Sequence, residues 1–483
     1  MALDPLILLS GTELARRIRA REVRSLEAVD AHIAQIERVN PRLNAMVAER
    51  FDAAREEARR ADALLASTPD PAALPPFHGV PCSIKECFAL TGMPQTSGLV
   101  ARKGYLAADD ATAVARLRAA GAIPLGVTNV SELCMWMESN NRVYGRSNNP
   151  YDPRRTVGGS SGGEGAIVGA GGAPFGLGSD VGGSIRMPAF FNGVFGHKPT
   201  GGLVPNSGQF PLAQGATQRY CTTGPLARRA EDLMPLLRIL AGPDGLEAGC
   251  IAWPLGDPDS VRLDGLRVVS IEDNGLIPVS NELRQTQRRV AAALADRGAR
   301  VEWEHVPRLK QSLEIWSAML ASSEGGDFAT MLGNGVPVNA FLELVKWGFG
   351  RSAHTLPAIM LALLENVPKW TPVRTQRLVA LGAELRAELV KLIGPNGVLL
   401  YPPYASVAPR HAFPLAPPVC WAYTAILNVM ELPVTQVPLG LDPDGVPLGI
   451  QVAAVHGNDH VTIAVARELE RAFGGWVVPS LAG

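Results

Sequence analysis

The sequence predicts an α/β protein in which helices cover a largely buried sheet. Helical and strand-like segments alternate along most of the 483 residues, which is typical of this class. Hydrophobic residues make up 47% of the chain and charged residues 19%, so a large core is expected. Because α/β enzymes of this length often fold as one unit, we expect a single domain over residues 1–483.

The first part of the chain is expected to be helical. Ser10-Gly-Thr-Glu13 matches a capping box and predicts a helix directly after it. Apolar residues from Leu26 to Val39 recur at helical spacing and predict a second helix, which we expect to end at Asn40-Pro41. Residues 51–66 predict an exposed third helix, and residues 79–85 predict a short buried strand.

Later segments continue the alternation. Helices are predicted over 110–120, 281–296 and 460–473, and strands over 123–127, 268–271, 301–303, 434–437 and 448–452. Residues 313–372 form an apolar block that we expect to be helical.

Charge and motif content exclude several classes of protein. The 45 Lys and Arg residues nearly balance the 46 Asp and Glu residues, which argues against a nucleic-acid partner. No apolar run reaches the roughly 18 residues that span a bilayer, and the N-terminus lacks a signal-peptide pattern, so we expect a cytoplasmic protein. The six cysteines form no CxxC pair and the histidines no HExxH motif, so we expect neither a metal site nor disulfides.

Residues 157–202 are unusually rich in glycine and serine, with 16 glycines. Such composition is common in linkers, but apolar residues such as Phe175 and Phe190 are interleaved here, so we expect a buried segment. Buried glycine-rich backbone indicates close approach of the main chain to a packing partner or a ligand. G-x-S-x-G, the nucleophile-elbow pattern, matches at Ser160 and at Ser161, although a Gly/Ser-rich segment produces such matches easily.

Three motifs together resemble the amidase-signature family. They read Gly-Val-Pro-Cys-Ser-Ile-Lys85-Glu, Gly-Gly-Ser160-Ser161-Gly-Gly-Glu-Gly and Asp-Val-Gly-Gly-Ser184-Ile-Arg186-Met-Pro. Positions 85, 160 and 184 are separated by 75 and 24 residues, as the Ser–Ser–Lys triad of that family requires. Residues 131–136, 144–152 and 187–200 further resemble the fatty-acid amide hydrolases of the family.

The resemblance implies a fold and a set of roles. The fold is one mixed, twisted sheet flanked by helices, with the catalytic core at about residues 75–240 and a cis peptide bond before Ser160. Ser184 is the expected nucleophile and Lys85 the base, provided that burial keeps the lysine neutral, with Ser160 relaying the proton. No metal or cofactor is expected.

Further residues are expected to support the triad. The backbone N–H groups expected to bind the oxyanion are those of Val181, Gly182, Gly183 and Ser184. Ser161, Asp180 and Arg186 are expected to hold this loop by hydrogen bonds; binding of a substrate carboxylate by Arg186 is the alternative.

The apolar block 313–372 is interpreted as a substrate-binding cap, with membrane contact as the alternative. Candidate substrate contacts are Met135, Trp136, Trp316 and Trp347, each of which also suits plain core packing. For Cys87 and Cys134 we expect core packing, with a position beside the active site as the alternative. His78 and His197 are interpreted as structural.

The predicted activity is hydrolysis of an amide with a hydrophobic acyl or aryl part through an acyl-Ser184 intermediate. The same attack geometry serves esters and carbamates, so an esterase or urethane-cleaving enzyme is a close alternative. One component of a multi-protein amidotransferase that works on charged tRNA and a hydrophobic-ligand binder with an inactive site are the other hypotheses. The expected partner is a small-molecule substrate, and the chain is expected to be a monomer or a homodimer.

Overall fold

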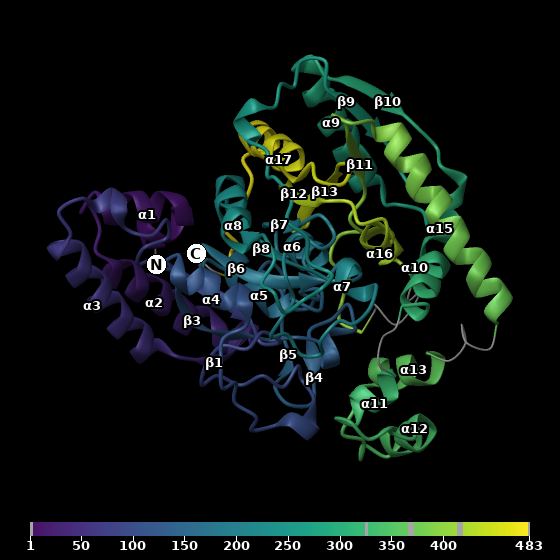
Figure 1. The fold of residues 1–483 in the computed structure, drawn as a ribbon, viewed down its shortest axis with the longest axis horizontal. Coiled ribbons are helices and arrows are strands. Elements are labelled where there is room, and N and C mark those ends of the chain that lie inside the picture. The colour runs from purple at the N-terminus through teal and green to yellow at the C-terminus, as the bar shows by residue number, and fades with distance from the viewer. Residues whose placement is uncertain (1–2, 324–326, 366–370, 413–418, 482–483) are drawn as a thin grey trace.

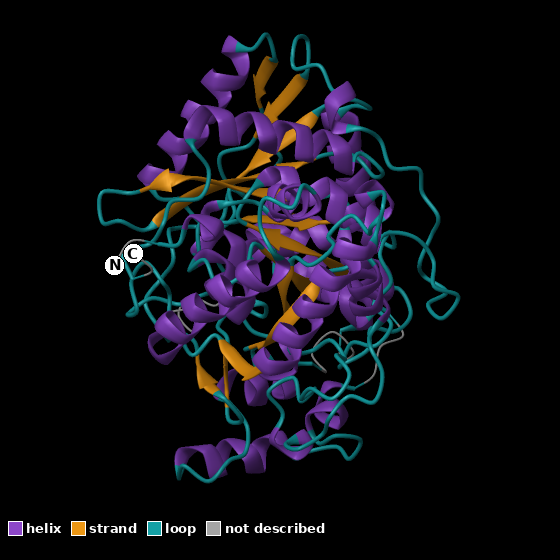
Figure 2. Ribbon diagram, turned by 90° about the vertical axis from the view of Figure 1, so that its left-hand side faces the viewer, coloured by secondary structure: helices purple, strands orange, loops and turns teal. Residues whose placement is uncertain are grey.

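A twisted eleven-stranded mixed sheet runs through the middle of the molecule, between helices on both sides (Figures 1 and 2). The computed structural model describes residues 3–323, 327–365, 371–412 and 419–481. In spatial order the strands are β1 (Met46–Glu49), β3 (Ile123–Thr128), β2 (Pro81–Lys85), β6 (Phe175–Asp180), β8 (Thr222–Ala227), β7 (Phe195–Lys198), β12 (Val434–Leu441), β13 (Pro447–Ala453), β11 (Val398–Tyr401), β9 (Arg267–Ser270) and β10 (Arg300–Trp303).

Parallel pairing links β2 to both β3 and β6, and β9 to both β10 and β11; the other neighbouring pairs are antiparallel. The short strands β4 (Asn140–Asn141) and β5 (Gly145–Arg146) form a separate hairpin. The helices are α1 (Gly11–Arg19), α2 (Ser25–Leu43), α3 (Phe51–Ser67), α4 (Thr112–Ala119), α5 (Gly162–Gly169), α6 (Arg186–Phe191), α7 (Thr217–Tyr220), α8 (Leu233–Leu240), α9 (Asn281–Asp296), α10 (Ser312–Ala321), α11 (Phe328–Leu332), α12 (Ala340–Gly348), α13 (Leu356–Leu364), α15 (Pro372–Ile393), α16 (Ala422–Val429) and α17 (Asp459–Phe473).

Local signals account for several of these boundaries. The Ser10 side chain accepts a hydrogen bond from the Glu13 N–H at 2.9 Å, as the capping box predicts. The predicted end of the second helix at Asn40-Pro41 is wrong, because α2 continues through Pro41 to Leu43. A proline in the last turn removes only one helical hydrogen bond, and the helix ends instead where Asn44 adopts the left-handed conformation, with φ 48°.

The core lies on both faces of the sheet. Leu226 and Ala227 are successive residues of β8, and they belong to two different hydrophobic clusters because side chains alternate across a strand. α5 lies against β2, β3, β6 and β8, and every one of its residues is buried. Close packing there needs glycine: a Cβ on Gly163 would lie 2.3 Å from the backbone nitrogen of Asn129.

The apolar block 313–372 divides into two parts. α10 packs against α15 and α16 and belongs to the main core. α11, α12 and α13 form a group of their own, which lies apart from the sheet at the lower right of Figure 1; we call residues 327–365 the three-helix unit. Within the described part of the chain, no helix is long and apolar enough to cross a membrane.

Candidate active site

The ends of two neighbouring strands bring the candidate residues to one edge of the sheet. β2 ends at Lys85 and β6 at Asp180, and the two strands are parallel, with Ile84 opposite Leu177. Their carboxyl ends therefore meet, and the loop from Asp180 to α6 carries Ser184 into the same region. The other serine, Ser160, stands just before the N-terminus of α5.

Lys85 is completely buried and directly contacts Ser160. Its Nζ donates to the Ser160 Oγ at 2.7 Å, to the Ser179 Oγ at 2.9 Å and, more weakly, to the Ser179 carbonyl at 3.4 Å. The peptide bond between Gly159 and Ser160 is cis. The Lys85 nitrogen therefore contacts three oxygen atoms, which together fix its position.

Ser184 lies beside this pair and keeps its hydroxyl free. The Ser161 N–H donates to the Ser184 carbonyl at 3.2 Å, which holds the two serine-bearing loops side by side. Ser184 is 7% exposed, and its Oγ makes no hydrogen bond to any residue that the structure describes. A hydroxyl in this state is available to attack a substrate, and catalytic hydrogen bonds of unliganded enzymes often form only once substrate is bound.

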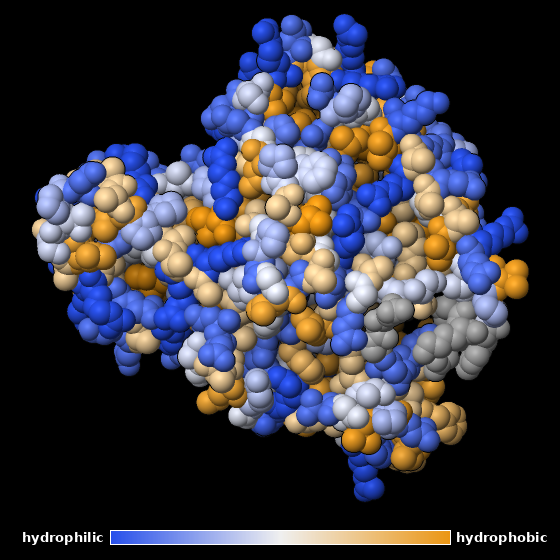
Figure 3. All heavy atoms as spheres, in the orientation of Figure 1, coloured by the Kyte–Doolittle hydropathy of each residue, from blue (hydrophilic) through white to orange (hydrophobic). Residues whose placement is uncertain are grey.

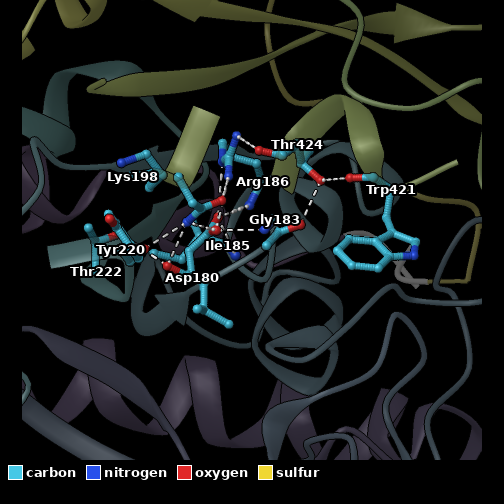
Figure 4. A network of polar contacts seen from close by, with 12 residues as sticks. Asp180, Gly183, Ile185, Arg186, Lys198, Tyr220, Thr222, Trp421 and Thr424 are labelled. Atoms are coloured by element: carbon cyan, nitrogen blue, oxygen red, sulfur yellow. Dashed lines mark hydrogen bonds and ion pairs between the residues drawn. The ribbon is translucent and has the colours of Figure 1, made fainter. Parts of the chain in front are cut away.

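Asp180 organises the loop that carries Ser184 (Figure 4). Its carboxylate accepts hydrogen bonds from the N–H groups of Gly183 at 2.6 Å, Ile185 at 3.0 Å and Arg186 at 3.3 Å. The Arg186 guanidinium adds two more at 3.0 Å, and the Asn428 amide one at 2.9 Å. Burial raises the pKa of Asp180, but Arg186 and Asn428 outweigh it and hold that pKa well below its usual value.

Arg186 is expected to hold the loop, and its contacts fit that role. It is completely buried and donates to the Thr424 carbonyl at 2.9 Å, the Gln451 Oε1 at 2.7 Å and the Asn428 Oδ1 at 2.5 Å, besides Asp180. These contacts use its donors, so the alternative role of binding a substrate carboxylate has no geometric support. Ser161 also supports the loop through Ser179, with hydrogen bonds of 3.3 and 3.4 Å.

The predicted set of oxyanion donors needs one correction. The Gly183 N–H points at Asp180, so it is not free for a substrate. The carbonyl of Val181 accepts a hydrogen bond from the Trp316 indole at 2.9 Å, and that of Gly182 accepts one from the Thr424 hydroxyl at 2.8 Å. The Val181 carbonyl and the Gly182 N–H belong to one trans peptide and point in opposite directions. The Trp316 hydrogen bond therefore directs the Gly182 N–H away from Trp316. Among the described residues, the N–H groups of Val181, Gly182 and Ser184 remain without an acceptor.

Two tryptophans cover this loop. Trp316 and Trp421 pack edge to face with ring centroids 4.6 Å apart, and a Cβ on Gly182 would lie 3.4 and 3.5 Å from them. Sequence reasoning selects Trp316 but misses Trp421, which stands alone in the chain without a motif. The backbone of Trp136 lies against the residue before Ser160: a Cβ on Gly159 would be 2.3 Å from the Trp136 carbonyl oxygen.

The remaining two candidate substrate contacts lie towards the three-helix unit. Met135 packs against its hydrophobic cluster and also against the main core. Trp347 is on α12 and 37% exposed, with no hydrogen bond or ring contact to the triad among the described residues. Its role as a substrate contact stays a prediction.

Cys87 and Cys134 lie beside Lys85. A position next to the active site is the alternative to plain core packing for these two residues. The Cys87 thiol is 3.8 Å from the Ser179 Oγ, and the Cys134 thiol lies close to Cys87 and Ser160. The contact with Cys87 outweighs the opposing effect of burial and lowers the pKa of Cys134 to about 6. Glu164, the Glu of the Gly-Gly-Ser160-Ser161-Gly-Gly-Glu-Gly motif, has no role predicted from the sequence; it accepts hydrogen bonds from Ser83 and Thr128 beneath the same strands, and burial raises its pKa to about 7.

A histidine-based triad finds no support in the geometry. His197 is completely buried, and its two ring nitrogens contact the Thr435 hydroxyl at 2.9 Å and the Asp459 carboxylate at 3.1 Å. Both nitrogens are therefore engaged, and neither is free to activate a serine. His78 contacts the Ala61 carbonyl at 3.0 Å through its Nε2.

Comparison with known proteins agrees with this geometry. The family model "Amidase" matches residues 27–463. The chain is 48% identical to fatty-acid amide hydrolase 2 of Homo sapiens over 492 aligned positions, covering 99% of this chain and 91% of that protein. It is 30% identical to an acylamidase of Rhodococcus erythropolis, covering 96% of this chain and 95% of that protein.

Among solved structures, that of 6-aminohexanoate cyclic dimer hydrolase complexed with substrate superimposes with a TM-score of 0.81 at 26% identity, covering 99% of this chain and 100% of that one. The predicted α/β fold class, the predicted resemblance to the fatty-acid amide hydrolases and the predicted amide-hydrolase class are confirmed by these comparisons. The chain belongs to the amidase family.

Proposed function

We propose that this enzyme hydrolyses amides of hydrophobic acyl or aryl acids, with Ser184 as the nucleophile and Lys85 as the base. The observation that carries the proposal is the buried Lys85–Ser160 contact of 2.7 Å beside a serine whose hydroxyl is free. This contact places Ser160 within proton-transfer distance of the Lys85 nitrogen, as a relay from serine to base requires.

The proposed reaction has two halves. The Ser184 Oγ attacks the amide carbon while its proton passes through the Ser160 hydroxyl to Lys85, and the N–H groups of Val181, Gly182 and Ser184 face the oxyanion that forms. Collapse of this intermediate breaks the C–N bond, and the departing amine takes the proton from Lys85 through Ser160. Water then attacks the acyl-Ser184 ester by the same route and releases the carboxylic acid.

The preference for a hydrophobic acyl part rests on the surroundings of the site. Trp316 and Trp421 lie against Gly182, next to the proposed oxyanion position. The three-helix unit adds apolar surface, visible as orange and tan residues at the lower right of Figure 3. Its exposed large apolar residues are Val336, Phe341, Leu342, Val345, Trp347, Phe349, Met360 and Leu364. The name of the human relative, a fatty-acid amide hydrolase, points to the same substrate class.

A series of p-nitroanilides with increasing acyl length tests the proposal, with matched esters and carbamates as parallel arms. Amide turnover that rises with acyl length supports it. Turnover confined to the esters or carbamates would instead support the alternative hydrolase, and ammonia transfer that requires copurifying proteins would support the amidotransferase. A Ser184→Ala variant is the control for each arm, because it removes the nucleophile.

Location and partners remain proposals. We propose that the enzyme is cytoplasmic and acts as a monomer or homodimer on a small-molecule substrate. We also propose that the apolar face of the three-helix unit forms part of a substrate-binding cap. Membrane contact by that face is the alternative, which sedimentation with phospholipid vesicles distinguishes: an enzyme that stays in the supernatant supports the cap.

A further inference from the structure

One short segment connects the candidate active site with the three-helix unit. We call residues 131–139 the site strap. At its C-terminal end, the Ser139 N–H donates to the Gly158 carbonyl at 3.0 Å, and the Ser139 hydroxyl donates to the Ser160 carbonyl at 3.2 Å. The strap therefore holds the backbone on both sides of the Gly159–Ser160 peptide.

The other end of the site strap packs against the three-helix unit. Leu133 is completely buried and shares a small hydrophobic cluster with Phe328 and Leu332 of α11 and Ala358 of α13. Leu133 holds a left-handed conformation, with φ 52°, which is rare for a branched side chain and must be maintained by its contacts.

A buried contact between a carboxylate and an imidazole joins the same two parts. The Glu132 carboxylate contacts the His354 Nδ1 at 2.8 Å and accepts a hydrogen bond from the Thr355 N–H at 2.7 Å. The side chains of Glu132 and His354 are only 1% and 8% exposed. Thr355 is the N-cap of α13, so the carboxylate also lies at the positive end of that helix.

Hydrogen bonds extend from this pair to the other helices of the unit. The His354 N–H donates to the Ser352 hydroxyl at 3.0 Å, which in turn donates to Glu343 of α12 at 2.7 Å. Glu365, at the end of α13, accepts hydrogen bonds from the Phe328 N–H at 2.6 Å and from the Ala329 N–H, both at the start of α11. The three helices are thus tied into one body, and Glu132 attaches that body to the strap.

We propose that Glu132 is a positioning residue: paired with His354, it fixes the three-helix unit relative to Ser160 and thereby sets how well a long acyl chain binds. The inference rests on the proposed function, because it assigns the acyl part of the substrate to the apolar surface of this unit. Loss of the pair lets the unit shift, so binding of a long chain weakens while the bond-breaking groups around Lys85 stay in place.

The test compares decanoyl and acetyl p-nitroanilide in Glu132→Gln, His354→Gln and the double variant. Glutamine retains an acceptor for the Thr355 N–H but replaces the carboxylate that contacts His354 with a neutral amide. We expect KM for the decanoyl substrate to rise about tenfold, the effect of losing one charge-assisted hydrogen bond, with kcat and the acetyl substrate unchanged. The double variant should resemble either single variant, since each removes the same pair.

Glu138→Gln is the matched control. Glu138 lies on the same strap and forms the same type of pair at 2.6 Å, but its partner, His411, lies outside the three-helix unit. We expect any change in this control to be equal for the two substrates.

Several results would overturn the proposal. An equal loss on both substrates in Glu132→Gln indicates a general structural role, and so does failure of both single variants to fold. Unchanged kinetics, or additive effects in the double variant, show that the pair does not position the unit. A wild-type enzyme that cleaves the acetyl substrate but gains nothing from the longer chain contradicts the proposed acyl preference itself, and this proposal with it.

Discussion

Arg186→Met tests whether the buried ion pair beneath the Ser184 loop contributes more to stability and activity than the exposed ion pairs of this protein do. Arg186 donates five side-chain hydrogen bonds, two to Asp180 and one each to Thr424, Gln451 and Asn428. Methionine fills a similar volume but satisfies none of these acceptors, so Asp180 remains buried without its countercharge.

The expected cost is large because neither partner reaches solvent. Removing one member of a buried pair costs about 3–5 kcal/mol, and we expect the free energy of unfolding to fall by that amount at neutral pH. The pKa of Asp180 lies below its ordinary 3.8 in the folded protein, so its ionised form stabilises the fold above that pH. This stabilisation is lost as the pH falls towards the lowered value, and without Arg186 the loss should begin at a higher pH.

Urea unfolding at several pH values measures both effects, alongside turnover of a p-nitroanilide. The control is Arg154→Met, which breaks an ion pair of similar length to Asp152; there the arginine side chain is 71% exposed, so we expect no resolvable change. If Arg186→Met proves as stable and as active as the control, the loop does not depend on the buried pair, and the assignment of Asp180 as its organiser is wrong.

Three other substitutions test separate parts of the site. Gly183→Ala should lower turnover about tenfold or more, because φ there is +117° and a Cβ would lie 2.1 Å from the Thr424 hydroxyl; wild-type kinetics would contradict this conformation of the loop. Lys85→Ala should reduce the rate far more at neutral than at alkaline pH, where hydroxide replaces the base, and a uniform loss across the pH profile would place the base elsewhere. Burial raises the pKa of Glu164 from 4.5 to about 7, so its stabilising effect is full below pH 4.5 and lost as the pH rises through 7. Between pH 4.5 and 7, Glu164→Gln should therefore reduce the change in the free energy of unfolding by about 3 kcal/mol. An unchanged pH dependence would refute the raised pKa of Glu164.

The sequence predicts a helix or strand well when the residues that specify its apolar face and its ends all lie within or next to that element. The helix over 281–296 has the bounds predicted for it, because its apolar stripe and its ends are all local. Motif spacing selects Lys85, Ser160 and Ser184, and the structure brings them to one edge of the sheet. The predicted helix end at Pro41 fails because the true stop signal, Asn44 in the left-handed conformation, depends on contacts with residues beyond that helix.

Contacts that join distant parts of the chain cannot be predicted in this way. Thr424, Asn428 and Gln451 reach Arg186 across more than 230 positions, and only the packing of α16 and β13 beside α6 brings them there. The same reason explains why the sequence alone groups Gly183 with the oxyanion donors: its motif shows a flexible backbone, but only the folded loop shows that its N–H points at Asp180.

The most direct test of the account is to identify the residue that a fluorophosphonate probe modifies. The labelled protein is digested, and the adduct is located by mass spectrometry in the wild type, Ser184→Ala and Ser160→Ala. We expect the adduct on Ser184 alone, none in Ser184→Ala, and slower labelling at Ser184 in Ser160→Ala. An adduct on Ser160, or labelling that persists in Ser184→Ala, would contradict the assignment of Ser184 as the nucleophile.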